Sequence, residues 1–159
     1  MYCEKEFFDY DKSRIKTIRW MVSETNHRLH RENDLPAEIH FFDNKNNTQI
    51  QNLKKVIWFR NGKVSRENGP AIVEYYEYEN NKRQVKREEW FIDDVRHREH
   101  NESSNKPALI EYFKNGKVKA EAWYIHGYHT KGIESPQNES LKNTSDLCLN
   151  LSICCLFFK

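Results

Sequence analysis

The chain of 159 residues has little of what most enzyme and metal-site motifs require. It contains only five glycines and four prolines, and it has no nucleophile elbow, phosphate-binding glycine loop or HExxH motif. Its four cysteines form no CxxC pair, which argues against a zinc ribbon or a redox motif. We therefore expect no enzyme, no catalytic residues, no cofactor and no metal site.

Long apolar segments are also absent. No stretch approaches the roughly 20 apolar residues of a membrane-spanning helix, and the first twelve residues lack the apolar run of a signal peptide. The abundance of Asn and Lys is typical of an AT-rich genome, which is compatible with a viral source. None of the cysteines, Cys3, Cys148, Cys154 and Cys155, lies in the middle of the chain, which favours a reducing cytoplasm, or the host cytoplasm for a viral protein.

A basic excess is missing too. The 26 Lys and Arg residues are balanced by 24 Asp and Glu residues, whereas dedicated nucleic-acid-binding domains carry a clear basic excess. Hydrophobic residues make up only 37% of the chain, but aromatic residues reach 13%. This composition predicts a thin sheet covered by aromatic side chains rather than a deep aliphatic core.

Two linked patterns recur along the chain. The first, P-A-x-[IV]-[EH]-[FY]-[FY], occurs three times without gaps, and its last part recurs as Glu6-Phe7-Phe8. The second, W-[FYM]-x5-[HST]-[RK], occurs four times. The first pattern begins at Pro36, Pro70 and Pro107, the second begins at Trp20, Trp58, Trp90 and Trp123, and its basic residues are Arg28, Arg66, Arg98 and Lys131.

The spacing between the two patterns varies where Asn, Gly and Lys cluster, and Asn115-Gly116 is a strong hairpin-turn signal. β-Hairpins tolerate loops of different length, whereas helical repeats would lose their phase. Proline fits the entry to a strand, because it cannot donate to a central ladder. We therefore predict an all-β fold in which antiparallel hairpin repeats form one elongated twisted sheet or shallow solenoid over residues 1–132, with hairpins at about 6–22, 37–60, 71–93 and 108–126.

The segments Trp58–Tyr76 and Tyr112–Tyr124, both with an Asn-Gly turn and the first with Gly-Pro-Ala, resemble the divergent MORN-like repeat. Such repeats occur in antitoxin-like bacterial proteins and in large DNA viruses. The resemblance covers roughly residues 6–132 and departs from the family pattern in the first and third linkers. It implies a β-hairpin repeat that mediates contacts with proteins or membranes, and it brings no catalytic residues.

The basic residues that end the second pattern admit two interpretations. They could form a row that meets an acidic partner or phosphates, or each could pack over a neighbouring Trp and cap loop carbonyls. The packing interpretation is favoured. Three H-x-x-H pairs do not predict a metal site, because residues three apart on a strand point to opposite faces.

After Gly132 the pattern stops. Residues 133–146 are polar and are expected to form a linker, and residues 147–159 form a short apolar tail, LCLNLSICCLFFK. The tail could cap the end of the sheet, associate with a membrane after acylation at Cys154 or Cys155, or result from a frameshift or truncation. Capping or truncation is favoured over an anchor.

The sequence therefore favours a non-enzymatic repeat module for protein–protein interaction or scaffolding. A protein partner is expected, and self-association through an exposed edge strand is the second possibility. The alternative function is a peripheral module that binds phospholipid surfaces through Arg28, Arg66, Arg98 and Lys131. Binding to nucleic acid is disfavoured, because the strands also carry many Glu residues.

Overall fold

A computed structural model describes residues 1–43, 52–77, 82–98 and 106–134. Within these ranges the chain is all-β and contains no helix. Its main body is one antiparallel sheet of nine strands that neighbour one another in chain order. These strands are β1 (Tyr2–Phe8), β2 (Asp11–Met21), β3 (Glu38–Phe41), β4 (Leu53–Ile57), β7 (Ile72–Tyr75), β8 (Val85–Glu89), β11 (Leu109–Tyr112), β12 (Val118–Ile125) and β13 (Tyr128–Glu134).

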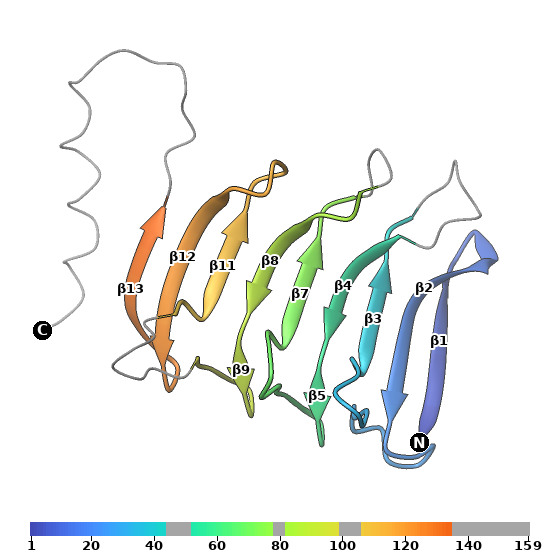
Figure 1. Cartoon of the computed structure of the whole chain (residues 1–159). Coiled ribbons are helices and arrows are strands. Elements are labelled where there is room, and N and C mark those ends of the chain that lie inside the picture. The colour runs from blue at the N-terminus through green and yellow to red at the C-terminus, as the bar shows by residue number, and fades with distance from the viewer. Residues whose placement is uncertain (44–51, 78–81, 99–105, 135–159) are drawn as a thin grey trace, which may run out of the picture.

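Figure 1 shows these strands side by side in an open, curved sheet, with β1 at one edge and β13 at the other. The predicted all-β, antiparallel fold class is confirmed. Strands that make many contacts with each other are always hydrogen-bonded neighbours in a sheet. The described residues therefore form no second layer over the main sheet. The core of this protein is therefore the set of side chains packed along the surface of one sheet.

Two short hairpins extend the sheet at its lower end in Figure 1. They are formed by β5 (Phe59–Arg60) with β6 (Lys63–Val64), and by β9 (Phe91–Ile92) with β10 (Val95–Arg96). Their two-residue turns have positive φ angles, as type I′ hairpins require: 52° and 87° at Asn61 and Gly62, and 49° and 68° at Asp93 and Asp94.

The hairpin turns also join neighbouring units, where a unit is the segment around one of the four tryptophans. The N–H of Gly62 donates to the Leu29 carbonyl at 2.8 Å, and the N–H of Asp94 donates to the Val64 carbonyl at 2.9 Å. In the fourth unit, Gly127 donates to the Arg96 carbonyl at 3.0 Å. Each turn is thus attached to the unit before it, which sets the spacing between units.

A β-bulge occurs at the same place in every unit. The register shifts between the residue at the [EH] position and the first aromatic residue, at Glu6/Phe7, His40/Phe41, Glu74/Tyr75 and Glu111/Tyr112. One residue on the opposite strand is left without a partner each time. Bulges increase the twist of a strand and bend it, so four equivalent bulges curve the whole sheet in one direction. The unpaired residues are Lys16, Lys54, Lys86 and Lys119.

The last strand corrects one predicted boundary. The pattern was expected to stop after Gly132, but β13 continues to Glu134, and Ile133 pairs with Glu121 of β12. Strand β13 occupies the place beside a Trp strand that the Pro-Ala strands take in the other units. The rest of the predicted linker and the apolar tail at 147–159 lie outside the described residues.

Candidate functional site

A row of alternating tryptophan and alanine residues crosses the lower part of the sheet. When the strand registers are extended by one residue, Ala37 lies opposite both Trp20 and Trp58, and Ala71 lies opposite both Trp58 and Trp90. The backbone agrees, because the N–H of Trp58 donates to the Ala71 carbonyl at 2.8 Å. The alanine of each Pro-Ala pair is fully buried. An alanine between two indole-bearing strands leaves room for both rings, which explains why the Pro-Ala pattern and the Trp pattern occur together.

A basic side chain lies over each tryptophan ring. The guanidinium carbons of Arg31, Arg66 and Arg98 lie 3.8, 3.9 and 3.8 Å from the ring centroids of Trp20, Trp58 and Trp90. The same three arginines donate through Nη1 to the carbonyls of Pro36, Pro70 and Pro107, at 3.3, 3.3 and 3.0 Å. This is the packing interpretation of the basic row, in which the arginine joins a tryptophan to the entry of the next strand.

The structure corrects one member of that row. The sequence spacing selected Arg28, but Arg31 is the residue that lies over Trp20. The N–H that donates to the tryptophan carbonyl comes from His30 in the first unit, and from Ser65 and His97 in the next two. The first loop is therefore three residues longer than the others. Arg28 instead is exposed, and its side chain lies beside Gly62.

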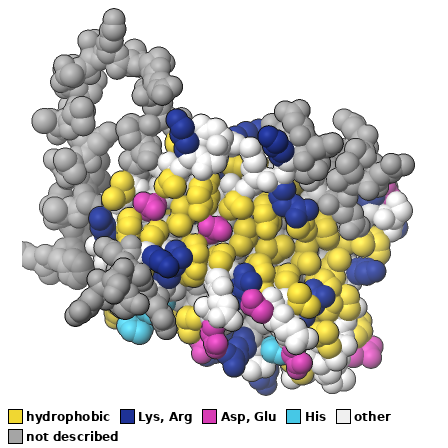
Figure 2. Space-filling model, viewed as in Figure 1, with side chains coloured by type: hydrophobic (Ala, Val, Ile, Leu, Met, Phe, Trp, Pro, Cys, Tyr) yellow, Lys and Arg dark blue, Asp and Glu magenta, His cyan; other side chains and the backbone are white. Residues whose placement is uncertain are grey.

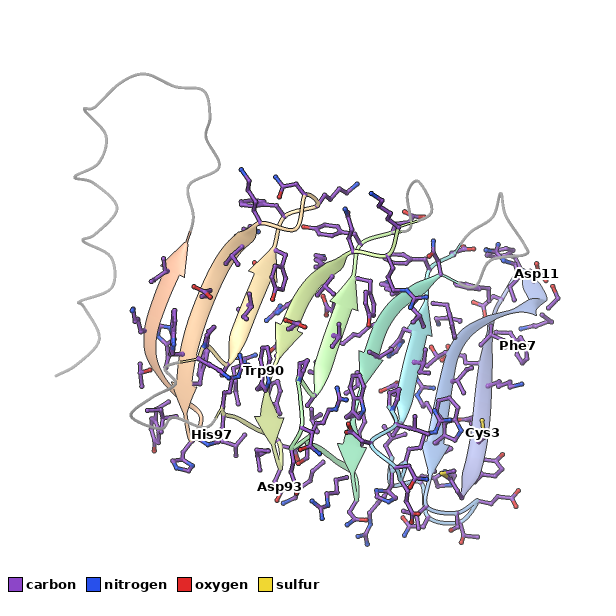
Figure 3. All side chains as sticks on the ribbon, viewed as in Figure 1. Cys3, Phe7, Asp11, Trp90, Asp93 and His97 are labelled. Carbon is purple, nitrogen blue, oxygen red and sulfur yellow. The ribbon has the colours of Figure 1, made fainter. Side chains whose placement is uncertain are left out.

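Lys131 occupies the equivalent position in the fourth unit. Its Nζ lies 4.8 Å from the ring centroid of Trp123, and the two residues are paired across β12 and β13. The structure thus places Arg66, Arg98 and Lys131 along the row of tryptophans, with Arg31 in place of Arg28. Figure 3 shows Trp90 where β8 passes into β9, with Asp93 and His97 near the lower end of the sheet.

Arg66 makes one further contact, with Asp34 of the preceding unit. Its Nε and Nη2 atoms donate to the two carboxylate oxygens at 2.8 and 2.7 Å. This hydrogen-bonded ion pair holds the pKa of Asp34 below its ordinary value of 3.8. Together with Trp58 and the Pro70 carbonyl, Asp34 occupies the face and both edges of the Arg66 guanidinium.

Two grooves separate neighbouring units along this row. The first groove, between the first and second units, has a volume of about 410 Å³ and includes Asp34 and Arg66 in its lining. The second groove, between the second and third units, has a volume of about 1220 Å³ and includes Trp90 and Arg98. The two grooves are equivalent by their place in the pattern, but they differ in size and charge.

The two faces of the sheet differ in chemistry. Because side chains alternate along a strand and paired residues share a face, Ile18, Ile39, Val56 and Val73 all lie on the face that carries the tryptophans. We call this the apolar face, and Figure 2 shows a broad hydrophobic area over the strands. The other face carries a ladder of ion pairs, among them Arg19–Glu38 at 2.9 Å, Lys55–Glu74 at 3.1 Å and Arg87–Glu89 at 2.9 Å.

The apolar face changes character toward the C-terminal edge. Glu88 and Glu121 occupy the positions that Ile18 and Val56 hold in the first two units, two residues before each tryptophan. The Tyr112 hydroxyl donates to Glu88 at 2.7 Å, which keeps this carboxylate hydrogen-bonded on an apolar surface. Burial, and then the bond to Glu88, raise the pKa of Tyr112. The aliphatic part of the face is thus concentrated over β2, β3, β4 and β7.

Basic side chains border the apolar face at both ends of the strands. The arginines over the tryptophans lie at one end. At the other end, Arg83 lies over the ring of Tyr75, 5.7 Å from its centroid. An apolar centre with a basic border is the main chemical feature of this surface.

No family model, no curated protein and no solved structure matches this chain. The MORN-like resemblance therefore stays a prediction.

No helix in the described ranges is long and apolar enough to cross a membrane. Within the same ranges, no three His, Cys, Asp or Glu side chains are grouped so that they could hold a metal ion. Two histidines from different H-x-x-H pairs, His97 and His126, instead stack on each other, with ring centroids 4.7 Å apart.

Two features of the surface have a signal in the sequence that the two recurring patterns do not include. A lysine precedes each of the four tryptophans by four residues, and these lysines are the bulge residues. The dipeptide His-Arg also occurs twice in the first loop, at His27-Arg28 and His30-Arg31. The second copy is the one that continues the row. The pairing of Asp34 with Arg66 had no such signal, because it joins two units across 32 residues.

Proposed function

We propose that this chain is a non-enzymatic protein-binding module whose apolar face binds a partner protein. The partner presents an apolar patch with acidic side chains at its margin. The observation that carries the proposal is the apolar face itself, which no second layer of described residues covers. Exposed apolar patches with a polar rim are typical of protein interaction sites.

The form of the surface supports a protein partner. Val56 and Val73, at the centre of the face, are 4% and 6% exposed. Ile18 and Ile39 remain half-buried and accessible. A centre rich in aromatic and aliphatic side chains with a charged rim resembles the anatomy of protein interfaces, in which the rim stays in contact with water.

The charges favour a protein partner over an anionic lipid surface. A lipid surface attracts basic groups that are free to approach phosphates. Arg66 is instead held by Trp58, the Pro70 carbonyl and the carboxylate of Asp34. Glu88 and Glu121 lie on the same face and would repel anionic headgroups. An acidic margin on a protein, in contrast, can meet the separate basic groups one by one.

Photocrosslinking from the two faces tests this proposal. Tyr75→p-benzoylphenylalanine places the crosslinker on the apolar face, and Lys55→p-benzoylphenylalanine is the matched control on the charged face of the adjacent strand. Both sites are half-buried, so their local accessibility is similar. We expect one discrete heterologous protein product from position 75 in cells that naturally make the chain, and none from position 55.

Three results would contradict the proposal. Equal crosslinking from both positions would remove the apolar face as the binding surface. A product of twice the chain's own mass would indicate self-association instead. Salt-sensitive binding of the wild-type chain to phosphatidylserine vesicles, with no protein product from position 75, would favour the phospholipid-binding function.

A further inference from the structure

The first groove shows what an arginine of this row binds when all its donors are used. Arg66 stacks on Trp58, its Nη1 donates to the Pro70 carbonyl, and its Nε and Nη2 donate to both oxygens of Asp34. A planar guanidinium fork fits a planar carboxylate in this two-point geometry, which a lysine cannot reproduce. In this groove the chain supplies the carboxylate itself.

The second groove repeats this arrangement without the carboxylate. Arg98 stacks on Trp90 at 3.8 Å, and its Nη1 donates to the Pro107 carbonyl at 3.0 Å. Among the described residues, no acidic side chain pairs with Arg98. The residue two positions before the proline, where the first unit has Asp34, is Asn68 in the second unit. Burial lowers the pKa of Arg98, and the nearby negative charge of Glu88 opposes this shift only in part.

The two grooves also differ in charge and in room. The described lining of the first groove has three basic and three acidic residues, so its formal charges balance. The second has three basic residues, Arg66, Arg98 and Lys106, and one acidic residue, Glu67. Glu67 is itself paired with Arg60 at 2.5 Å. Because Arg66 is likewise paired with Asp34, the positive charge of the second groove comes from Arg98 and Lys106. Its volume of about 1220 Å³ is large enough for a side chain with part of its backbone.

We propose that the second groove binds a carboxylate side chain, Asp or Glu, of a partner protein on the Arg98 guanidinium, in the geometry that Asp34 adopts on Arg66. This inference deepens the proposed function, because it gives the chemistry of one acidic residue at the margin of the partner's apolar patch. Ile92 and Val95, which are 38% and 40% exposed, lie in the same groove and can contact an apolar neighbour of that residue.

A peptide taken from the first groove is the natural probe. Acetyl-Gln-Asn-Asp-Leu-Pro-amide reproduces residues 32–36 with Glu32 replaced by Gln, so that it carries one carboxylate. The full chain is labelled with ¹⁵N, and the Nε–Hε signals of Arg66 and Arg98 are followed by NMR as the peptide is added. We expect a weak, saturable shift of the Arg98 signal. The Arg66 signal serves as the internal control and should not move, because Asp34 already occupies that site.

Matched variants separate a carboxylate site from general charge attraction. The peptide with Asn in place of its Asp should bind at least tenfold more weakly. Arg98→Lys keeps the positive charge but removes the fork, and should weaken binding at least fivefold. Asn68→Asp leaves Arg98 intact and places a carboxylate at the Asp34-equivalent position. It should weaken binding of the peptide to a similar extent. Because Arg98 is unchanged in this variant, that loss cannot be caused by misfolding that follows from the Arg98 substitution.

Two outcomes would overturn the inference. Equal binding of the Asp and Asn peptides would show that no carboxylate is recognised. Tighter binding of inorganic phosphate than of the Asp peptide would assign the groove to a phosphate ligand instead. The assay needs no partner protein, so a failure here leaves the crosslinking result from position 75 standing, and a failure of that experiment leaves this one interpretable.

Discussion

At the residue scale, the alanines of the Pro-Ala pairs matter most for packing. Ala71 is fully buried between the strands that carry Trp58 and Trp90, although the sheet has no second layer of described residues above it. In a protein with a deep core, a buried alanine can often be enlarged if its neighbours move. Here the neighbours are two indole rings, each held from above by an arginine. The site therefore has little freedom to adjust.

Ala71→Leu should lower the free energy of unfolding by about 1–3 kcal/mol, the usual cost of overpacking a tight site. The loss arises because the added atoms must displace Trp58 or Trp90 and the arginine stacked on it. Ala120→Leu is the matched control, since Ala120 is only half-buried and lies on the opposite face, paired with Glu111. Urea unfolding of both variants checks this. Equal losses would show that the alanine does not act as a spacer between the tryptophans.

At the element scale, the four β-bulges decide which side chains reach each face. In the second unit, His40 pairs with Lys55 and Phe41 pairs with Leu53, so that Lys54 is the extra residue. Removing Lys54 makes these two pairs consecutive and leaves every side chain on its own face. Removing Val56 instead moves Lys55 to the apolar face, opposite Ile39 and Val73. Deletion of one residue from a strand moves the neighbouring side chains to the opposite face, unless the deleted residue is the extra residue of a bulge.

Deletion of Lys54 should therefore give a folded protein with a small loss of stability, whereas deletion of Val56 should cost several kcal/mol or prevent folding. The difference arises because the second deletion places a lysine at a position that is 4% exposed in the native chain. Circular dichroism and urea unfolding of the two deletion variants provide the measurement. If the Lys54 deletion were as damaging as the Val56 deletion, the bulge itself would be required for folding, and placing side chains on the correct face would not explain the loss.

The fold at this scale was largely predictable from the sequence, and the site only in part. The spacing of Trp58 and Trp90 from their Ser-Arg and His-Arg pairs is constant, because a tight two-residue turn sets it. The first loop breaks that spacing by three residues, so the sequence could not distinguish Arg28 from Arg31. The contact between Asp34 and Arg66 depends on how neighbouring units stack, which local patterns do not contain.

At the scale of the whole molecule, the sheet is close to one-dimensional. Among the described residues each strand contacts mainly its two neighbours, and the edge strands β1 and β13 have one neighbour each. Stability in such a structure comes from local units and the interfaces between them, so opening should begin at the ends. The bonds between units, from Gly62 to Leu29 and from Asp94 to Val64, are the contacts that oppose it.

Native-state hydrogen exchange can measure this gradient with matched amides. The N–H groups of Trp20 and Trp58 donate to the carbonyls of Ala37 and Ala71 in equivalent bonds, both 2.8 Å long. Any difference in their protection therefore reports position in the sheet rather than bond geometry. We expect the amide of Trp58, in the middle of the sheet, to exchange at least tenfold more slowly than that of Trp20, one strand from the edge. Equal protection would instead show that all four units open together as one cooperative structure, in which the bonds between units outweigh the stability of each unit alone.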